Sequence, residues 1–292
     1  MGGYGTTMKW IIATISLFYI VGCEQIGCNG AGPSPSPSPV PTPIPPLGTV
    51  VLSFPSAIPG SLGSIDFKGE YIVEYCRGAA KLFWRNPLTG EVVKELALDP
   101  KLNKLWAVCW DEGRQMYGAT NPDLAGYPQN IIKIGQDGKY LGGARMPADT
   151  SKPALVLHDI VANGSYVPND PDGDAVAAND WNTSDDHYSL RKCDHINPDT
   201  YREEFWWKYT ISHWGQTRVG NKFWAACSKN NPVKGEYPIY EFNEGQHRQF
   251  TTATGRWILV LGACFTSLKT DPNGRFIWGK SNLGISKISL GI

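Results

Sequence analysis

Beyond residue 47 the chain alternates short apolar runs with turns. The runs are rich in Val, Ile, Tyr, Phe and Trp, and the turns in Gly, Asn, Asp and Pro. Apolar residues alternate with polar ones instead of following the spacing of an amphipathic helix, a pattern typical of β-strands. No stretch of this region carries helical periodicity of useful length. The pattern therefore predicts an all-β domain.

An imperfect repeat organises these runs, in which a glycine closes a tight turn and opens an apolar strand. The five segments are FKGEYIVEYC, DEGRQMYGAT, ANGSYVPND, RVGNKFWAAC and PNGRFIWGKS. Their glycines are Gly69, Gly113, Gly164, Gly220 and Gly274, with spacings of 44, 51, 56 and 54 residues. A further strand with its own turn follows each segment. This is the sequence pattern of four-stranded antiparallel blades repeated radially.

The repeats predict a five-bladed β-propeller over residues 47–292. The fifth unit ends one strand short, and we expect Thr49–Phe54 to pair with it and close the ring, because an open ring leaves unpaired edges. TSLKTDPNGRFIWG, NPLTGEV and GQDGKYLG resemble the turn sequences of many unrelated propellers. That resemblance implies the fold and selects no single activity. A β-sandwich or two smaller β domains are the alternatives.

Composition supports a folded domain and disfavours one class of partner. The chain has 27 basic and 27 acidic residues, a balance that argues against nucleic-acid binding, which normally needs a basic stripe. Hydrophobic residues make up 41% of the chain and aromatic residues 12%, which is enough for a substantial core.

The N-terminus predicts export. Trp10–Gly22 is an apolar run of 13 residues preceded by Lys9, the length of a signal-peptide core and too short for a spanning helix. Ile20-Val21-Gly22-Cys23 resembles the bacterial lipobox. The resemblance implies that residues 1–22 are a signal peptide, that Cys23 carries a lipid, and that the rest lies outside the cytoplasm at a cell membrane or outer membrane. An ordinary secretory signal and an uncleaved short anchor are the alternatives.

Residues 23–46 form the predicted linker. Its segment Pro33–Pro46, PSPSPSPVPTPIPP, has 14 residues and no hydrophobic periodicity. Proline fixes φ and removes the N–H, so we expect a polyproline II spacer about 40–45 Å long. A lipid and a stiff spacer together hold a domain clear of the membrane.

The cysteines other than Cys23 are disulfide candidates in an exported protein. The repeat register places Cys76 and Cys109 on adjoining units, and Cys227 and Cys264 at the same relative positions in later ones. We therefore predict the pairs Cys76–Cys109 and Cys227–Cys264. Buried free thiols, which pack as small hydrophobic groups, are the alternative.

Two polar sets are candidate sites. Asp170, Asp172 and Asp174 alternate along the chain and offer oxygen ligands suited to Ca²⁺, although their spacing is not that of an EF-hand and a solvated loop is the alternative. The innermost strands of a propeller line a central channel, where ligands usually bind. The polar residues expected at its mouth are Asp66, Asp111, His158, Asp159, His213, Gln216 and Thr266.

The channel residues allow several functions. A His–Asp pair could act as a general base and the group that orients it, and two His with an Asp could hold a metal ion. The third alternative is that these polar groups only form hydrogen bonds with one another. No GxSxG, HExxH, Walker or dinucleotide motif is present. Tyr71–Gly78 is similar in placement to a glutamate-bearing strand of the five-bladed glutaminyl cyclases, whose accompanying FTQGL-like and GEG-like segments are missing.

The sequence favours a membrane-anchored binding module for a protein or glycan, with no cofactor except possible Ca²⁺. The alternatives are an extracytoplasmic hydrolase or cyclase with its site at the channel mouth, and a structural envelope component. Aromatic side chains near turns or strand ends offer flat faces for sugars or peptides, although most tryptophans in a propeller pack between blades. These side chains are Trp84, Trp110, Trp181, Trp214 and Trp278.

Overall fold

The structure is a computed structural model. It describes residues 43–112, 115–121, 127, 131–144, 156–161, 175–182, 187–194, 203–209, 213–220, 222–227, 237–243, 250–251 and 253–292. Only the backbone is described for the strands between residues 156 and 209. Residues 43–292 form one compact unit, which begins before the boundary expected at residue 47.

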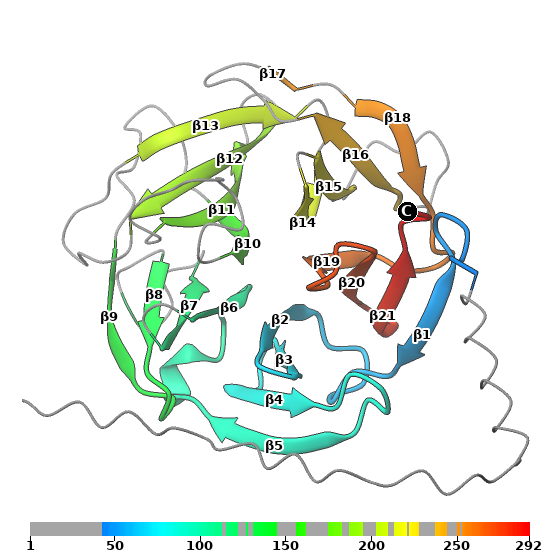
Figure 1. Ribbon diagram of the computed structural model, residues 1–292. Coiled ribbons are helices and arrows are strands. Elements are labelled where there is room, and N and C mark those ends of the chain that lie inside the picture. The colour runs from blue at the N-terminus through cyan, green and yellow to red at the C-terminus, as the bar shows by residue number, and fades with distance from the viewer. Residues whose placement is uncertain are drawn as a thin grey trace, which may run out of the picture. The chain divides into compact units, whose positions relative to one another are not determined.

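Four sheets of four antiparallel strands are arranged radially, so the unit is a β-propeller (Figure 1). The first sheet contains β2 (Gly63–Lys68), β3 (Tyr71–Cys76), β4 (Lys81–Arg85) and β5 (Val92–Ala97). The second sheet contains β6 (Val108–Asp111), β7 (Met116–Thr120), β8 (Ile131–Ile134) and β9 (Tyr140–Ala144). A short 3₁₀ helix, η1 (Pro100–Leu102), lies in the chain between them.

The remaining strands form three more sheets. One contains β10 (Val156–Val161), β11 (Ala175–Asn182), β12 (His187–Asp194), β13 (Glu203–Tyr209) and β17 (Phe250–Thr251), with β13 and β17 parallel. The next contains β14 (His213–Val219), β15 (Lys222–Cys227), β16 (Ile239–Asn243) and β18 (Ala253–Ile258). The last sheet contains β19 (Phe265–Thr270), β20 (Phe276–Ser281), β21 (Gly284–Ser289) and β1 (Val50–Phe54).

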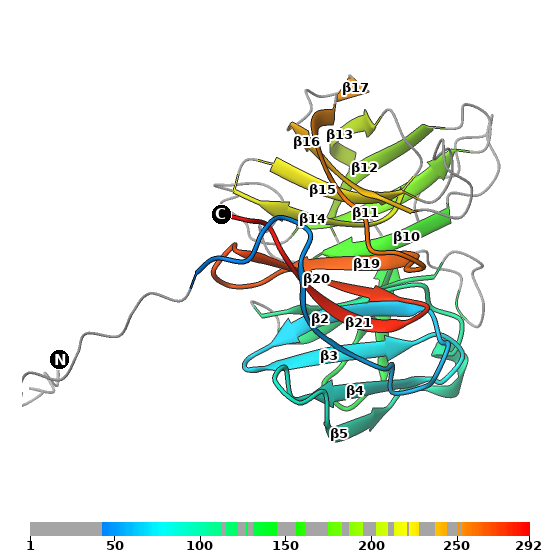
Figure 2. The ribbon, with the colours of Figure 1, turned by 90° about the vertical axis from the view of Figure 1, so that its right-hand side faces the viewer.

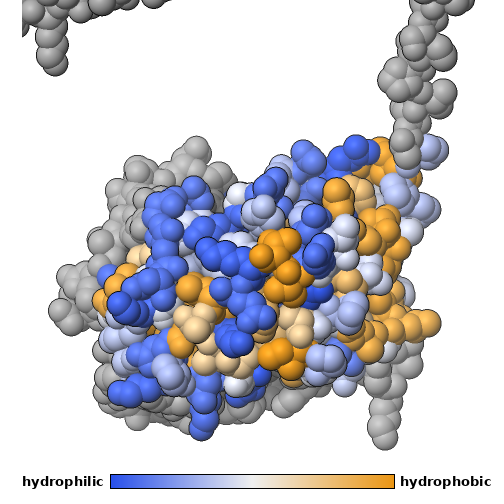
Figure 3. Space-filling view, turned by 90° about the horizontal axis from the view of Figure 1, so that it is seen from below, coloured by the Kyte–Doolittle hydropathy of each residue, from blue (hydrophilic) through white to orange (hydrophobic). Residues whose placement is uncertain are grey.

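The first strand of each sheet lies innermost. In the order β2, β6, β10, β14 and β19, each of these strands contacts the next, and β19 also contacts β2 (Figure 1). The outer strands β1, β5 and β18 carry exposed apolar side chains, among them Val50, Val93 and Trp257. On the face seen from below in Figure 1, apolar groups lie scattered among polar ones (Figure 3).

Strand β1 comes from the beginning of the described chain and pairs with its last strand. Val50 lies opposite Ile288 and Phe54 opposite Ile285 in an antiparallel register (Figures 1 and 2). The hydroxyl of Ser289 donates a 2.7 Å hydrogen bond to the carbonyl of Pro45, which extends this contact beyond β1. The last sheet is therefore built from both ends of the compact unit.

Glycines make the predicted turns between the first two strands of three sheets. Gly69, Gly220 and Gly274 have φ values of 59°, 59° and 68°, in the left-handed region that other residues rarely adopt. They follow β2, β14 and β19 directly or within a few residues. The corresponding Gly113 and Gly164 lie outside the described residues.

Hydrophobic side chains pack between neighbouring sheets. One cluster joins the first and second sheets through Val73, Trp84, Trp110 and Tyr117, all buried. Another joins β1 and the last sheet to the first sheet. Its members are Phe54, Ile65, Ile72, Trp278 and Ile285. The first sheet thus shares its core with the second and last sheets, as neighbouring blades of a propeller do.

The expected signal peptide, Cys23 and the proline-rich segment up to residue 42 lie outside the described residues. Within the described part, no helix has the length and apolar character needed to cross a membrane.

Candidate functional site

The inner strands are linked to one another by polar side chains. Ser64 on β2 accepts a 2.7 Å hydrogen bond from the backbone N–H of Val108 on β6 and donates to the carbonyl of the same residue at 3.1 Å. Thr217 on β14 accepts a 2.9 Å bond from the N–H of Thr270 on β19. Thr266 donates a 2.7 Å bond to the carbonyl of Gly63. These side chains form hydrogen bonds with backbone N–H and C=O groups on the innermost strand of the adjacent sheet.

Asp66, predicted at the channel mouth, has the same kind of role. Its carboxylate accepts 2.8 Å hydrogen bonds from the N–H groups of Trp110 and Phe67. Burial raises the pKa of Asp66, while the charge of Lys269 and the two backbone donors oppose that rise. Both carboxylate oxygens are therefore occupied by backbone groups, one of them on the neighbouring sheet.

The other predicted channel residues are placed only in part. Asp111 on β6 and Gln216 on β14 are buried. His158 and Asp159 lie on β10 and His213 begins β14, but their side chains lie outside the described residues.

The predicted calcium ligands Asp170, Asp172 and Asp174 also lie outside the described residues. Among the residues whose positions are described, no group of three or more His, Cys, Asp or Glu side chains is arranged to hold a metal ion.

The predicted disulfides are wrong, since Cys76, Cys109 and Cys264 are free thiols. Cys76 lies on β3, and the inner strand β2 separates β3 from the strand of Cys109, β6. The Cys76 sulfur instead lies 3.4 Å from the hydroxyl of Ser56. Burial raises the pKa of the Cys109 thiol well above its usual range, so this thiol stays protonated. For the second pair, the side chain of Cys227 is not described, and Cys264 is unbridged.

Glu74 on β3, the glutamate of the cyclase-like segment, is fully buried in an ion network. Its carboxylate lies 3.1 Å from the Lys280 ammonium and 2.6 Å from the Arg85 guanidinium. Ser56 donates to it at 2.6 Å and the Ala57 N–H at 3.1 Å. Burial raises the pKa of Glu74, but the Lys280 charge and these hydrogen bonds outweigh burial and lower it. The carboxylate ties three segments together, and its side chain is not exposed to solvent.

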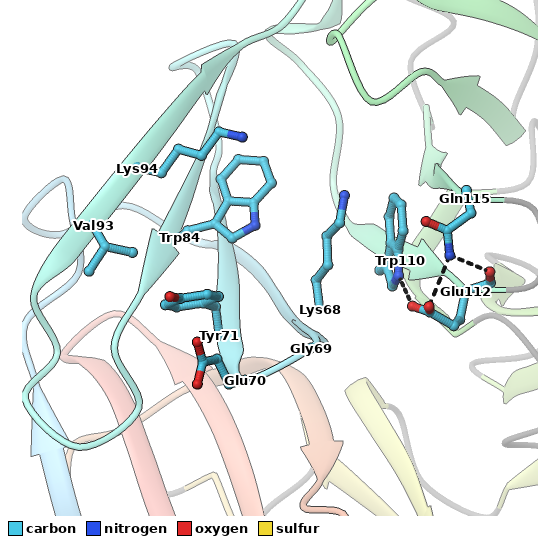
Figure 4. A pocket seen from close by; sticks show the side chains of 10 residues that line it. All are labelled: Lys68, Gly69, Glu70, Tyr71, Trp84, Val93, Lys94, Trp110, Glu112 and Gln115. Atoms are coloured by element: carbon cyan, nitrogen blue, oxygen red, sulfur yellow. Dashed lines mark hydrogen bonds between the residues drawn. The ribbon is translucent and has the colours of Figure 1, made fainter. Parts of the chain in front are cut away.

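A pocket of about 770 Å³ lies between the first and second sheets (Figure 4). It is formed by the β2–β3 turn, by β4 and β5, and by the end of β6 with the segment after it. Its lining consists of Lys68, Gly69, Glu70, Tyr71, Trp84, Val93, Lys94, Trp110, Glu112 and Gln115. The size falls in the range of small-molecule sites, about 300–1,000 Å³, and the lining combines aromatic walls with a few charged groups.

Lys68 lies against the aromatic wall of this pocket. Its ammonium is 3.4 Å from the centroid of the Trp110 ring and 5.0 Å from that of Tyr117. It also donates a 3.3 Å hydrogen bond to the Tyr117 hydroxyl. Burial and the neighbouring charge of Lys94 lower the pKa of Lys68, and Glu112 opposes that change. The wall is held rigid because Trp110 packs on Tyr117, with ring centroids 4.8 Å apart.

The acidic groups of the pocket are engaged by neighbours on the same segment. The Glu112 carboxylate accepts hydrogen bonds from the Trp110 indole N–H and, at 2.9 Å, from the Gln115 amide (Figure 4). These bonds lower the pKa of Glu112. The neighbouring Glu70 carboxylate raises the pKa of the Tyr71 phenol.

The sequence pointed to only part of this pocket. Trp84 and Trp110 were among the aromatic candidates, and both are almost fully buried, so only a small part of each is exposed. Trp278 is buried between sheets, and the side chains of Trp181 and Trp214 lie outside the described residues. Lys68 and Lys94 were not expected. The sequence feature that could have indicated this site is Lys68, which directly precedes the turn glycine Gly69.

The fold defines the chain as a β-propeller. No family model matches it, and no curated protein does. Among solved structures, it is similar to the hydrazine synthase of Kuenenia stuttgartiensis, with 10% identity, a TM-score of 0.42, and coverage of 79% of this chain and 58% of that one. It is also similar to a chain of a mitotic checkpoint complex, with 7% identity, a TM-score of 0.39, and coverage of 77% and 63%. The chain thus spans less than two thirds of either structure.

Proposed function

We propose that the chain is a binding module that recognises a glycan or protein ligand in the pocket between the first and second sheets. The observation that carries this proposal is the lining of that pocket. Lys68, Trp84, Lys94 and Trp110 bring two cations and two aromatic rings together around one cavity. Concave sites with aromatic walls and a few placed charges are the usual form of a ligand site.

We further propose that the domain is a closed ring of five blades. The sequence of contacts among the inner strands supports it, because β19, the last of them, lies beside β2. The pairing of β1 with β21 supports it as well, since it joins the two ends of the unit in one sheet.

The module is anchored outside the cytoplasm by a lipid on Cys23 and carried on the Pro33–Pro46 spacer. This part of the proposal rests on the apolar run, the lipobox-like Ile20–Cys23 and the proline pattern. Labelling of cells with a fatty-acid analogue tests it. Wild-type protein is expected to take up the label and fractionate with membranes, while Cys23→Ser takes up none. Equal labelling of both proteins would overturn the anchor.

A catalytic site at the channel, as in a hydrolase or a glutaminyl cyclase, is the alternative function. The contacts of Asp66 and Glu74 favour binding over this alternative. Both carboxylates accept hydrogen bonds that tie separate strands together, and Glu74 is in addition paired with two cations. Each therefore has a structural use that accounts for its position.

A binding screen tests the module. The full chain, purified in detergent, is exposed to glycan and peptide arrays with and without Ca²⁺, in parallel with the variant Trp84→Leu. We expect a retained ligand class that is lost or weakened in the variant, whose folding is checked by circular dichroism. Absence of any ligand for the folded wild-type chain, together with turnover of a test substrate, would replace the binding proposal with the enzymatic one.

A further inference from the structure

Two lysines share one aromatic side chain of the pocket. The ammonium groups of Lys68 and Lys94 lie 5.7 and 5.0 Å from the centroid of the Trp84 ring (Figure 4). Within the described part of the chain, neither forms an ion pair, although five other ion pairs are present there. The two cations come from different strands, β2 and β5, so the fold itself brings them together.

The carboxylates of the pocket do not lie between these cations. Glu112 is held by Trp110 and Gln115, and Glu70 lies beside Tyr71 (Figure 4). Like charges at short range repel, and the repulsion grows as water is removed from around them. Among the described residues, the charge of Glu112 offsets this repulsion at Lys68 only in part, so an anion placed between the two ammonium groups adds a counter-charge.

The rest of the wall is suited to a flat, rigid ligand. Tyr71 and Val93 line the pocket beside Trp84, and the Val93 side chain is 48% exposed. At Gly69 no atom lies within 4 Å of the position that a Cβ would take, so the turn leaves open space at the rim. The apolar face of a pyranose ring fits such a wall, while its charged substituent reaches the lysines.

We propose that this pocket binds an anionic sugar residue of a polysaccharide, with its acid group between Lys68 and Lys94 and its ring against Tyr71, Val93 and the exposed part of Trp84. The inference rests on the proposed binding function and names the ligand class. A glycan is favoured over an acidic peptide, because an Asp or Glu side chain brings the charge on a flexible stem and loses rotamer freedom on binding. A sugar ring carries its acid group on a rigid frame.

The test is calorimetric titration of the full chain in detergent. The probes are hyaluronate oligosaccharides, the same oligosaccharides with their carboxylates reduced, heparin oligosaccharides, and poly-glutamate. The first variant is Lys94→Gln, which removes one cation from the pocket. The second is Val93→Asp, which places a negative charge at the exposed rim without disturbing the core. Lys139→Gln is the matched control, since Lys139 is highly exposed and pairs with Asp137 at 3.2 Å, outside the pocket.

We expect hyaluronate or heparin to bind. The neutral reduced oligosaccharide should bind at least about tenfold more weakly, because it lacks one charge–charge contact, and a tenfold change in affinity corresponds to about 1.4 kcal/mol. Lys94→Gln and Val93→Asp should each weaken binding by about tenfold, and Lys139→Gln by less than about twofold. Preference for hyaluronate would identify a carboxylate ligand and preference for heparin a sulfate ligand.

Other outcomes would overturn the inference in distinguishable ways. Equal binding of the acidic and reduced oligosaccharides would remove the need for an anion and leave the binding module intact. Unchanged acidic binding in both pocket variants would move the site elsewhere on the module. Binding of poly-glutamate in place of the glycans would assign a peptide ligand. If no probe binds and the wider array is also silent, the binding function itself fails.

Discussion

The carboxylate of Glu74 on β3 lies 3.1 Å from the ammonium of Lys280 on β20, and neither side chain is exposed to solvent. The first sheet and the last sheet therefore meet at a buried ion pair. Ser56, from the segment between β1 and β2, completes the contact, because its hydroxyl donates to Glu74 at 2.6 Å and accepts from Lys280 at 2.7 Å. Three segments that are distant in the sequence depend on one carboxylate.

Replacement of Glu74 should be strongly destabilising. Glu74→Gln leaves Lys280 and Arg85 buried without their counter-charge, and removal of one partner from a buried pair costs about 3–5 kcal/mol. Urea unfolding measures the loss. Glu95→Gln is the matched control. Its pair with Lys81, at 2.9 Å, is about half exposed on both sides, so it should cost less than about 1 kcal/mol. Equal losses for the two variants would contradict the network.

The same carboxylate predicts a dependence of stability on pH. Because the folded-state pKa of Glu74 is lowered below its usual 4.5, its contribution is fully present above that value and is lost as the pH falls through the folded-state pKa. Melting temperatures of wild type and Glu74→Gln should therefore differ most near neutral pH and converge in acid. A gap between the two melting temperatures that does not narrow at any acid pH at which both proteins still fold would assign the loss to packing instead.

Phe54 tests the attachment of β1. Its ring is almost fully buried and lies 6.2 Å from that of Trp278, with the Arg85 guanidinium 4.7 Å from its centroid. Phe54→Ala should lower the unfolding free energy by about 3 kcal/mol. Val51→Ala on the exposed face of the same strand should change it by less than about 0.5 kcal/mol. If Phe54→Ala is as mild as Val51→Ala in denaturant titration, β1 is not part of the stable domain.

Ser64 tests the structural role of the inner strands. Ser64→Ala leaves the N–H of Val108 without its 2.7 Å acceptor in a buried position, at a cost of about 1–3 kcal/mol. Thr89→Ala, on an exposed turn of the same sheet, serves as the control and should be nearly neutral. Unfolding of both variants by heat makes the comparison, and an unchanged Ser64→Ala protein would argue that the inner strands are held by other contacts.

Lys68 gives anion binding a pH dependence. The pKa of Lys68 is lowered from its usual 10.5 by burial first and then by Lys94. Affinity for the acidic glycan should therefore decline as the pH rises through a value below 10.5, where free lysine is still charged. Lys68→Arg keeps its charge throughout this range and should hold its affinity to higher pH. Titrations at a series of pH values compare the two, and identical profiles would exclude Lys68 from the anion contact.

Features governed by local sequence were predicted well. The turn glycines Gly69, Gly220 and Gly274 have the positive φ that their positions in the repeat required. The inner strands, and the pairing of Val50 with the strand of Ile288, followed from alternation and from the missing fifth-unit strand. Each of these depends on the period of two along a strand, which the sequence displays directly.

Features that depend on how two sheets face each other were not predicted. Lys68 and Lys94 belong to different strands, and only the distance of each from Trp84 shows that they share a site. The repeat placed Cys76 and Cys109 on adjoining units, but it did not show that β2 lies between their strands. Alternation tells which face of a strand is apolar, but it does not tell which residues of the next sheet meet that face.

The partnership of β1 with β21 has a consequence for synthesis. Translation begins at the N-terminus, so β1 is synthesised early. The strand that pairs with it, Gly284–Ser289, is synthesised much later, and until then the backbone of β1 lacks this partner. Contacts between such distant residues form slowly, because the whole intervening chain must first be ordered. During that interval β1 is an unpaired apolar strand that can form intermolecular β-sheet contacts with other chains. A chain of this design therefore benefits from a chaperone that covers β1 until β21 has been made.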